Sequence, residues 1–166
     1  MARVYVSIGS NVERERHVRA ALESLEARFG QLLVSPVYET EPVGFQGEPF
    51  YNLVVGFSAS DEPEMLVEQF RRIEAENGRV RGGARFAPRS LDIDLLLFDD
   101  RVEDRGRVRL PRDEIEKYAF VLRPLADIAP AQVHPVSGER FDRMWARMAA
   151  TDAGRPGMLR QVAFER

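Results

Sequence analysis

The most hydrophobic run of this chain, residues 91–98, carries aspartates at two alternate positions, Asp92 and Asp94. A short run of this composition predicts a β-strand. Because successive side chains of a strand point to opposite faces, Asp92 and Asp94 are expected side by side on one face. The other face is expected to be apolar and to consist of Leu91, Ile93, Leu95 and Leu97. The chain is therefore expected to build a sheet that presents two neighbouring carboxylates on one side.

The segments before this strand predict the element order β-α-β-β-α-β. Further strands are expected at residues 4–8, 32–37 and 52–57. Helices are expected after the first and third of these strands, with apolar stripes formed by Val18, Ala21, Leu22, Leu25 and Phe29 in one and by Leu66, Phe70 and Ile73 in the other. Their N-terminal caps are expected at residues 9–11 and at Asp61. This order predicts an α+β, ferredoxin-like sheet with both helices on one face and the other face free.

The remaining chain predicts a C-terminal α/β extension of this sheet. A strand is expected at residues 108–110 and short helices at 113–117, 121–128 and 141–148, with a tail at 162–164 that packs back. No linker or repeat interrupts the sequence, so residues 1–166 are expected to form one domain. Two irregular stretches, residues 39–49 and 79–88, are expected to be loops that close over a ligand and exclude water.

Composition removes several classes of site. The chain has no cysteine, which excludes disulfides, thiolate nucleophiles and cysteine-based metal sites. Of its two histidines, His17 is expected on the solvated side of the first helix and His134 in a loop without a chemical role. No apolar stretch approaches the roughly 20 residues of a membrane helix, and a net charge of −3 argues against a surface that binds nucleic acid throughout. We expect a cytoplasmic monomer without membrane or nucleic-acid partners.

An arginine-rich segment precedes the aspartate pair. It contains Arg71, Arg72, Arg79, Arg81, Arg85 and Arg89 against only Glu74 and Glu76. Guanidinium groups match the geometry of phosphate oxygens, and Mg²⁺ is commonly held by one or two carboxylates together with substrate phosphates. The combination indicates phosphoryl transfer, although each part alone also fits a solvated loop or a polar strand face. The phosphate-binding P-loop and the protein-kinase signature are absent from the sequence.

The segment Arg85-Phe-Ala-Pro-Arg-Ser-Leu-Asp-Ile-Asp-Leu-Leu96 resembles the signature of the 6-hydroxymethyl-7,8-dihydropterin pyrophosphokinases, enzymes of folate biosynthesis. The similarity extends through most of the chain, in the islands Ile8-Gly-Ser-Asn11, Tyr38-Glu-Thr-Glu-Pro-Val-Gly44, Phe50-Tyr-Asn52, Arg72-Ile-Glu74, Gly78-Arg-Val-Arg81, Pro124-Leu and Ile128-Ala-Pro130. The resemblance implies transfer of the terminal pyrophosphoryl group of ATP to the hydroxymethyl oxygen of a reduced pterin, with release of AMP.

The resemblance also implies a role for each matched residue. Two Mg²⁺ ions would be held by Asp92 and Asp94. The catalytic set would be Arg81, Arg89, Asp94 and Arg112, with Asp94 as a possible proton acceptor. ATP would be bound by Glu74, Arg79, Arg81, Arg89, Arg109 and Arg112. The pterin would be bound by Thr40, Pro42, Val43, Phe50, Asn52 and Phe120, and strand alternation independently places Phe50 and Asn52 on one face.

Two positions depart from the family pattern. Where the family usually has a histidine after a proline, this chain has Arg112, and where it usually has an arginine two residues before the stacking phenylalanine, it has Tyr118. Arg109 and Arg123 are candidates to compensate. The departures predict either the ordinary reaction at reduced efficiency or a related pterin as acceptor.

Two other classes of protein remain as alternatives. The first is a catalytically impaired sensor that binds pterin or ATP. The second is an RNA-binding domain, which shares the βαββαβ order but requires exposed aromatic residues in an Arg-Gly-Phe-like motif on its third strand, a motif that residues 52–57 lack.

Overall fold

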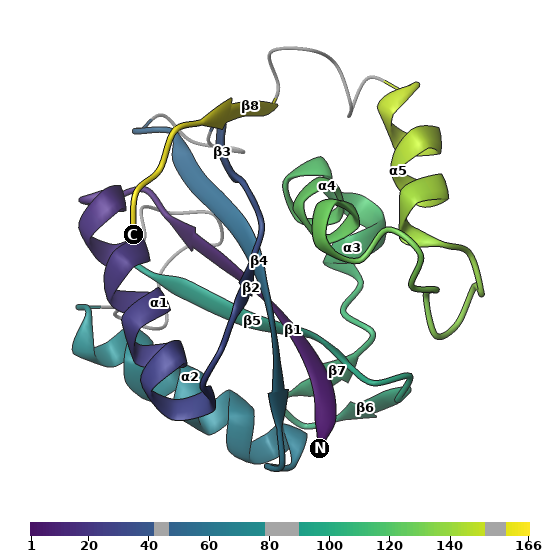
Figure 1. Cartoon of the computed structure of the whole chain (residues 1–166), viewed down its shortest axis with the longest axis horizontal. Coiled ribbons are helices and arrows are strands. Elements are labelled where there is room, and N and C mark those ends of the chain that lie inside the picture. The colour runs from purple at the N-terminus through teal and green to yellow at the C-terminus, as the bar shows by residue number, and fades with distance from the viewer. Residues whose placement is uncertain (42–46, 79–89, 152–158) are drawn as a thin grey trace.

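The computed structural model describes residues 1–41, 47–78, 90–151 and 159–166. Its main sheet is formed by β1 (Ala2–Ser10), β2 (Leu33–Val34), β3 (Val37–Thr40), β4 (Phe50–Ala59), β5 (Asp92–Phe98) and β8 (Leu159–Val162). The strand order is β5-β1-β4-β3-β8, with β2 paired to β4, and every pairing is antiparallel. The first four strands of this order have the ferredoxin-like arrangement that the element order predicts (Figure 1). The returning tail adds β8 as a further strand at the β3 edge.

Two helices cover one face of the sheet, as predicted. They are α1 (Arg14–Phe29) and α2 (Pro63–Glu76), which lie on the same side of the sheet in Figure 1. The centre of this layer is aromatic: Phe29 stacks on Phe57 with ring centroids 4.4 Å apart, and Phe70 meets Phe57 edge-on at 6.5 Å. These rings are buried together with aliphatic residues of the strands and helices, and their burial stabilises this layer.

The opposite face of the sheet, which was expected to be free, is partly covered by helices. The covering elements are α3 (Glu114–Lys117), α4 (Ala119–Ile128) and α5 (Phe141–Ala149), on the other side of the sheet from α1 and α2 (Figure 1). Val54 and Leu96 face these helices and are fully buried in a second apolar cluster with Leu122, Leu125 and Phe141. A hairpin of β6 (Glu103–Arg105) and β7 (Val108–Leu110) leads from β5 to this layer.

A β-bulge in β5 corrects the expected placement of Leu97. Val6 pairs with Leu95 and Tyr5 with Leu97, so Leu96 is an extra residue on β5. An extra residue reverses the inward and outward alternation beyond it. Leu97 therefore packs in the second cluster, whereas Leu91, Ile93 and Leu95 pack toward α1 and α2 as predicted.

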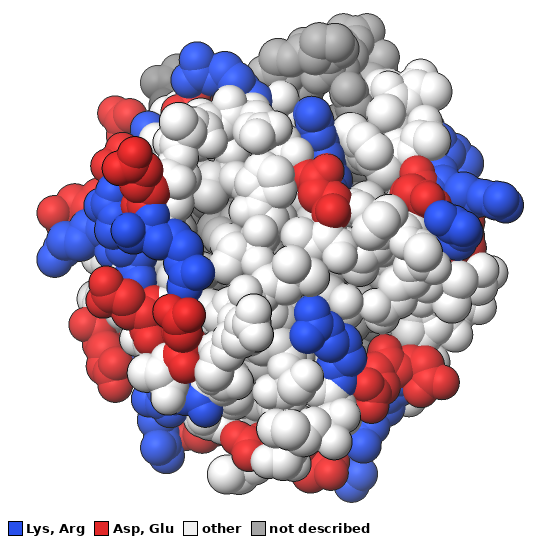
Figure 2. Space-filling view, viewed as in Figure 1, with Lys and Arg blue, Asp and Glu red and all other residues white. Residues whose placement is uncertain are grey.

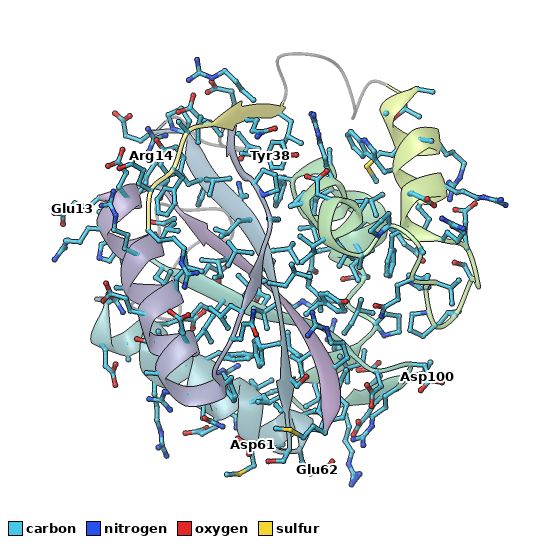
Figure 3. The ribbon with its side chains drawn as sticks, in the orientation of Figure 1. Glu13, Arg14, Tyr38, Asp61, Glu62 and Asp100 are labelled. Carbon is cyan, nitrogen blue, oxygen red and sulfur yellow. The ribbon has the colours of Figure 1, made fainter. Side chains whose placement is uncertain are left out.

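The helix starts differ from the expected caps. Helix α1 begins after Glu13, which has a left-handed backbone (φ 43°), while Ser10 still belongs to β1. Helix α2 begins after Glu62, with Pro63 in its first turn as predicted. Asp61 does not cap it, because its Oδ2 accepts a hydrogen bond from Gln69 Nε2 at 2.7 Å instead (Figure 3).

The expected strand at residues 32–37 is two short strands, β2 and β3, separated at Ser35 and Pro36. Proline cannot donate to a strand ladder, which explains the interruption. The Ser35 hydroxyl accepts a hydrogen bond from Val54 N at 2.9 Å across the break. The following loop is shorter than expected, since β3 continues to Thr40 and β4 begins at Phe50.

His17 is buried, not solvated. Its residue is 4% exposed, and Nδ1 donates to the carbonyl oxygen of Val12 at 2.5 Å. The helical spacing of apolar residues placed it on the polar side, but the turn before α1 folds over the ring. His134 lies in a loop as predicted and is also buried.

Figure 2 shows charged groups of both signs mixed over α1 and around the rim of the face in view. The centre of this face is largely uncharged. Within the described ranges, the helices include none long and apolar enough to cross a membrane.

Candidate active site

A cavity of about 530 Å³ opens at one end of the sheet, between the strands and the segment that carries α3 and the start of α4. Strands β1, β3, β4 and β5 contribute Ser7, Gly9, Thr40, Phe50, Asn52, Asp92 and Asp94 to its wall. The segment from β7 to α4 contributes Arg109, Arg112, Asp113, Glu114, Lys117, Tyr118 and Phe120. Residues far apart in the sequence therefore meet in one cavity.

The two aspartates of β5 lie in this wall on the same strand face. Asp92 pairs in register with Gly9 of β1, and Asp94 pairs with Ser7. Burial, and then repulsion by Asp92, raises the pKa of Asp94 above its usual range, although Arg112 opposes the shift. The pair therefore carries an unfavourable interaction when both carboxylates are ionised, which a cation between them would relieve.

Glu74 lies behind this strand. It is 1% exposed, and its Oε2 accepts a hydrogen bond from Ile93 N at 2.8 Å. A carboxylate that accepts from the β5 backbone fixes α2 against the strand that carries Asp92 and Asp94. The residues of the described cavity wall do not include Glu74, so its predicted contact with ATP stays a prediction.

Arg112 reaches the same end of the cavity from beyond β7. Its backbone N–H donates to Leu96 O at 3.0 Å, which ties it to β5. Its Nη2 lies 3.6 Å from Asp94 Oδ1, and its Nε donates to Glu114 Oε2. Arg109 also lines the cavity, with a side chain that is 67% exposed. These two arginines are placed where a nucleotide phosphate bound near Asp94 would meet them.

Apart from Glu41, which follows Thr40, the residues at the other end of the cavity are uncharged. Asn52 Nδ2 donates to Thr40 Oγ1 at 2.6 Å, which leaves Asn52 Oδ1 available as an acceptor. Phe50, two residues before Asn52 on β4, and Phe120 of α4 also line the cavity. The ring of Phe120 stacks on Tyr118, with centroids 4.9 Å apart and planes inclined by 18°. The predicted pterin-binding residues that the structure describes, Thr40, Phe50, Asn52 and Phe120, are therefore brought together.

Gly9 gives the Asn52 amide its space. A Cβ atom at Gly9 would lie 2.9 Å from Asn52 Oδ1, closer than such contacts normally occur. Because Gly9 has no side chain, the Asn52 amide can pack against β1, and Asn52 lines the cavity at this point.

Arg14 and Asn11 anchor the chain around the loop between β3 and β4. Arg14, at the start of α1 (Figure 3), donates to Glu39 Oε2 at 3.0 Å and to Pro49 O at 2.9 Å. Asn11 Nδ2 donates to Glu48 O at 3.2 Å. These contacts hold both described ends of the loop against the beginning of α1.

Helix α4, which carries Phe120, is fastened to β3. The Tyr38 hydroxyl donates to Asp127, and the Arg123 guanidinium lies 4.8 Å from the centre of the Tyr38 ring (Figure 3). Burial and this hydrogen bond raise the pKa of Tyr38 to about 12, so the hydroxyl keeps its proton at neutral pH. Arg123 is thus engaged beside Tyr38 and does not belong to the described cavity wall.

The described wall has more acidic than basic residues. Its acids are Glu41, Asp92, Asp94, Asp113 and Glu114, and its bases are Arg109, Arg112 and Lys117. A polyphosphate would be repelled from such a wall unless cations were added. Within the part of the chain that the structure describes, no group of three or more acidic or histidine side chains could hold a metal. Two carboxylates are nevertheless a suitable donor set for Mg²⁺, which takes its remaining ligands from phosphates and water.

Five predicted site residues, Pro42, Val43, Arg79, Arg81 and Arg89, lie outside the described residues. Sequence reasoning missed Gly9, Asp113, Glu114 and Lys117 as parts of the cavity wall. Gly9 belongs to a motif that was noticed, but its contact with Asn52 arises only from the register of β1 and β4. The acidic residues that follow Arg112 resemble ordinary helix-start residues, so the sequence held no signal for their location.

Comparisons with known proteins agree with this geometry. The family model described as 7,8-dihydro-6-hydroxymethylpterin-pyrophosphokinase (HPPK) matches residues 5–130. A 2-amino-4-hydroxy-6-hydroxymethyldihydropteridine pyrophosphokinase of Pseudomonas aeruginosa is 40% identical over 132 residues, which cover 77% of this chain and 81% of the relative. The Bacillus subtilis protein of the same name is 32% identical over 156 residues, covering 89% and 93%.

Solved structures show the same fold. The wild-type HPPK-DHPS of Plasmodium falciparum superposes with a TM-score of 0.73 at 14% identity, covering 97% of this chain and 47% of that chain. The present chain thus spans about half of that larger protein. Because the family model and the relatives match most of the chain, it belongs to the 7,8-dihydro-6-hydroxymethylpterin-pyrophosphokinase family of enzymes.

Proposed function

We propose that this protein transfers a pyrophosphoryl group from Mg²⁺-bound ATP to 6-hydroxymethyl-7,8-dihydropterin and releases AMP. The observation that carries the proposal is one cavity with two chemically different ends. Asn52, Thr40 and Phe120 line an uncharged end suited to a flat heterocycle with polar edges, and Asp92 and Asp94 line an acidic end. The name of the family supports the proposal, because it describes a pyrophosphokinase that acts on this pterin.

In the proposed reaction the pterin hydroxymethyl oxygen attacks the β-phosphorus of ATP. A new bond forms between this oxygen and the β-phosphorus. The bond between the β-phosphorus and the α,β-bridging oxygen breaks, and AMP leaves with that oxygen. The hydroxyl proton passes to Asp94 or to water. Two bound Mg²⁺ ions would neutralise charge on the transferring phosphates.

The protein's own contribution is alignment. Asp92 and Asp94 would hold the metal ions, and Arg112 and Arg109 lie where they could contact phosphate oxygens. Arg79, Arg81 and Arg89, from the segment outside the described residues, are proposed to complete the phosphate site. The pterin would lie between Phe50 and Phe120, with Asn52 Oδ1 accepting from its polar edge and Pro42 and Val43 closing over it. Alignment of two bound substrates can lower a barrier by roughly 7–11 kcal/mol, so a strong base is not required.

The direct test is AMP release from Mg²⁺-ATP with 6-hydroxymethyl-7,8-dihydropterin and with a panel of other reduced pterins. We expect one AMP per pterin consumed and no AMP when EDTA removes the metal. If AMP forms only with another reduced pterin, that pterin is the acceptor. The departures from the family pattern at Arg112 and Tyr118 could cause this result. Tight binding of Mg²⁺-ATP without AMP from any pterin would favour the sensor.

The role of Asp94 as proton acceptor has its own test. If Asp94 accepts the proton, Asp94→Asn should still lower turnover in samples in which metal binding is restored by excess Mg²⁺. Normal turnover under those conditions would remove this role and leave water as the acceptor.

A further inference from the structure

Glu114 is an acidic side chain in the part of the cavity where the nucleotide phosphates are proposed to bind. Its side chain is 24% exposed, and its Oε2 accepts a hydrogen bond from Arg112 Nε. A carboxylate at this place would repel phosphate unless a cation held it. The hydrogen bond to Arg112 therefore indicates that Glu114 acts by holding this arginine and not by contacting the phosphates itself.

Arg112 is held at two points. Its backbone N–H is tied to Leu96 O of β5, and the Nε edge of its guanidinium is tied to Glu114. The Nη2 atom of the same guanidinium lies 3.6 Å from Asp94 Oδ1, which is beyond good hydrogen-bond distance. Because a guanidinium is planar, fixing its Nε edge also fixes the direction of its Nη donors.

Removal of Glu114 would change the partner of Arg112. Among the described residues, Asp94 would then be the carboxylate left in ion-pair contact with Arg112, and the 3.6 Å gap could close to a direct ion pair. A direct pair with Asp94 would compete with a divalent cation for the same oxygens. The Nη donor engaged by Asp94 would also no longer be available to a bound phosphate.

We propose that Glu114 is a positioning residue that holds the Arg112 guanidinium beside the metal-binding carboxylates, with its Nη donors free for the nucleotide phosphates. This inference rests on the proposed function. It assigns to Glu114 an effect on Mg²⁺-nucleotide binding that is transmitted through Arg112. It also explains why an acidic residue is placed among groups that must accept a polyphosphate.

A double-mutant cycle tests the inference. Affinity for Mg²⁺ with the nonhydrolysable analogue α,β-methylene-ATP is measured by titration calorimetry in wild type, Glu114→Ala, Arg112→Ala and the double variant. We expect Glu114→Ala to weaken binding about tenfold and to raise the Mg²⁺ concentration needed for half-saturation. In the Arg112→Ala background the same change should alter affinity by less than about twofold.

Two matched variants separate positioning from charge and from folding. Glu114→Gln keeps an oxygen that can accept from Arg112 Nε, so its affinity should stay within about threefold of wild type. Glu64→Ala removes a glutamate that pairs with Arg107 at 2.9 Å outside the cavity, and should leave affinity unchanged. Thermal unfolding of each variant shows whether the protein remains folded.

Two results would overturn the inference. One is a tenfold loss for Glu114→Ala that persists when Arg112 is absent, since the effect would then come from the Glu114 charge or from the fold. The other is unchanged or tighter binding by Glu114→Ala. If the wild type releases AMP normally, either result refutes only the positioning role of Glu114. If the effect of Glu114→Ala depends on Arg112 as expected but the wild type releases no AMP, only the proposed reaction is refuted.

Discussion

The two ends of the cavity are built by opposite means. At the uncharged end, the polar group that faces the cavity is fixed by a neutral hydrogen bond, from Asn52 to Thr40, and by the space above Gly9. At the acidic end, Asp92, Asp94 and Glu114 lie close together and Arg112 is their described counter-charge. The first end has its hydrogen-bonding geometry without a ligand. Among the described residues, acidic side chains outnumber basic ones at the second end, so added cations would improve its charge balance.

This difference separates recognition from reaction. A preformed uncharged end can select a heterocycle by shape and by hydrogen bonds at little cost in reorganisation. An acidic end that needs cations can bind a polyphosphate only together with metal ions. Changes at the two ends should therefore affect different measurements, and the following predictions test this separation.

The largest effect is expected at the acidic end. Asp92→Asn and Asp94→Asn should each lower the rate of AMP formation by about 10²–10³-fold, because each removes a charge that would hold the metal. In metal-free protein the same variants should keep or increase the free energy of unfolding, since repulsion between the two carboxylates disappears. Rate assays with Mg²⁺ and urea unfolding without it measure the two quantities.

Asp142→Asn, on the exposed surface of α5, is the matched control and should change neither rate nor affinity. Near-normal rates for both cavity variants would show that the carboxylate pair does not hold the metal.

The next effect is expected at the uncharged end. Gly9→Ala would place a Cβ atom 2.9 Å from Asn52 Oδ1 and force the amide to move. We expect affinity for the pterin to fall about tenfold, corresponding to about 1.4 kcal/mol. Affinity for Mg²⁺ with α,β-methylene-ATP should remain within about twofold of wild type.

Calorimetric titration with each ligand separately gives both affinities for Gly9→Ala. An equal loss for pterin and nucleotide would break the proposed separation between the two ends of the cavity.

A smaller effect is expected from the aromatic pair. Tyr118→Ala removes the ring that stacks on Phe120. Stacked pairs contribute about 0.5–1.5 kcal/mol, so the KM for the pterin should rise about three- to tenfold with little change in kcat. Tyr118→Phe keeps the ring and should have an effect below about twofold. Steady-state kinetics with varied pterin distinguishes this role from a contact of the hydroxyl with phosphate, which would make Tyr118→Phe as harmful as Tyr118→Ala.

The smallest effect is expected away from the cavity, at His134. Its Nδ1 accepts from Val136 N and Ser137 N, both at 3.2 Å, so the neutral ring with the proton on Nε2 fits this turn. Burial lowers the pKa of His134 below its usual 6.5, and this outweighs the attraction of Glu116 at 3.2 Å. The carboxylate is too exposed to reverse the effect, because its side chain is 55% accessible.

The sign of the His134 effect follows from proton linkage. Between the two pKa values the unfolded chain binds more protons than the folded protein, so stability falls as the pH drops below about 6.5. His134→Asn can keep an acceptor for the turn but cannot titrate, so the part of the loss that is due to His134 should disappear. Urea unfolding at pH 8 and pH 5.5 measures it, and turnover at pH 8 should be unchanged. If wild type and His134→Asn lose the same free energy of unfolding between pH 8 and pH 5.5, His134 is not the group responsible.

Local sequence patterns predicted the central architecture. The run 91–98 predicted β5 and the neighbouring positions of Asp92 and Asp94, and the helical stripes predicted α1 and α2 on one face. The resemblance to the family predicted residues that the fold brings into one cavity, including Thr40 and Phe120. The strand and helix predictions depend on alternation and periodicity within short segments, which the sequence displays directly, whereas the cavity residues were implied by the resemblance.

Features that depend on distant segments were not predicted. The bulge that turns Leu97 to the other face depends on how β1 pairs with β5. The burial of His17 depends on the turn at Val12, and the place of Glu114 depends on how the segment after β7 returns to β5. No local pattern marks any of them.

The sequence by itself determined which strand carries the two carboxylates and which residues form the apolar stripes, because side-chain alternation and helical periodicity are properties of the local chain. Only the tertiary structure decided what stands opposite those carboxylates: an arginine held by Glu114, an amide held by Thr40 and a glycine without a Cβ atom. Such pairings follow from strand register and the packing of distant segments, and their energies exist only once those segments meet.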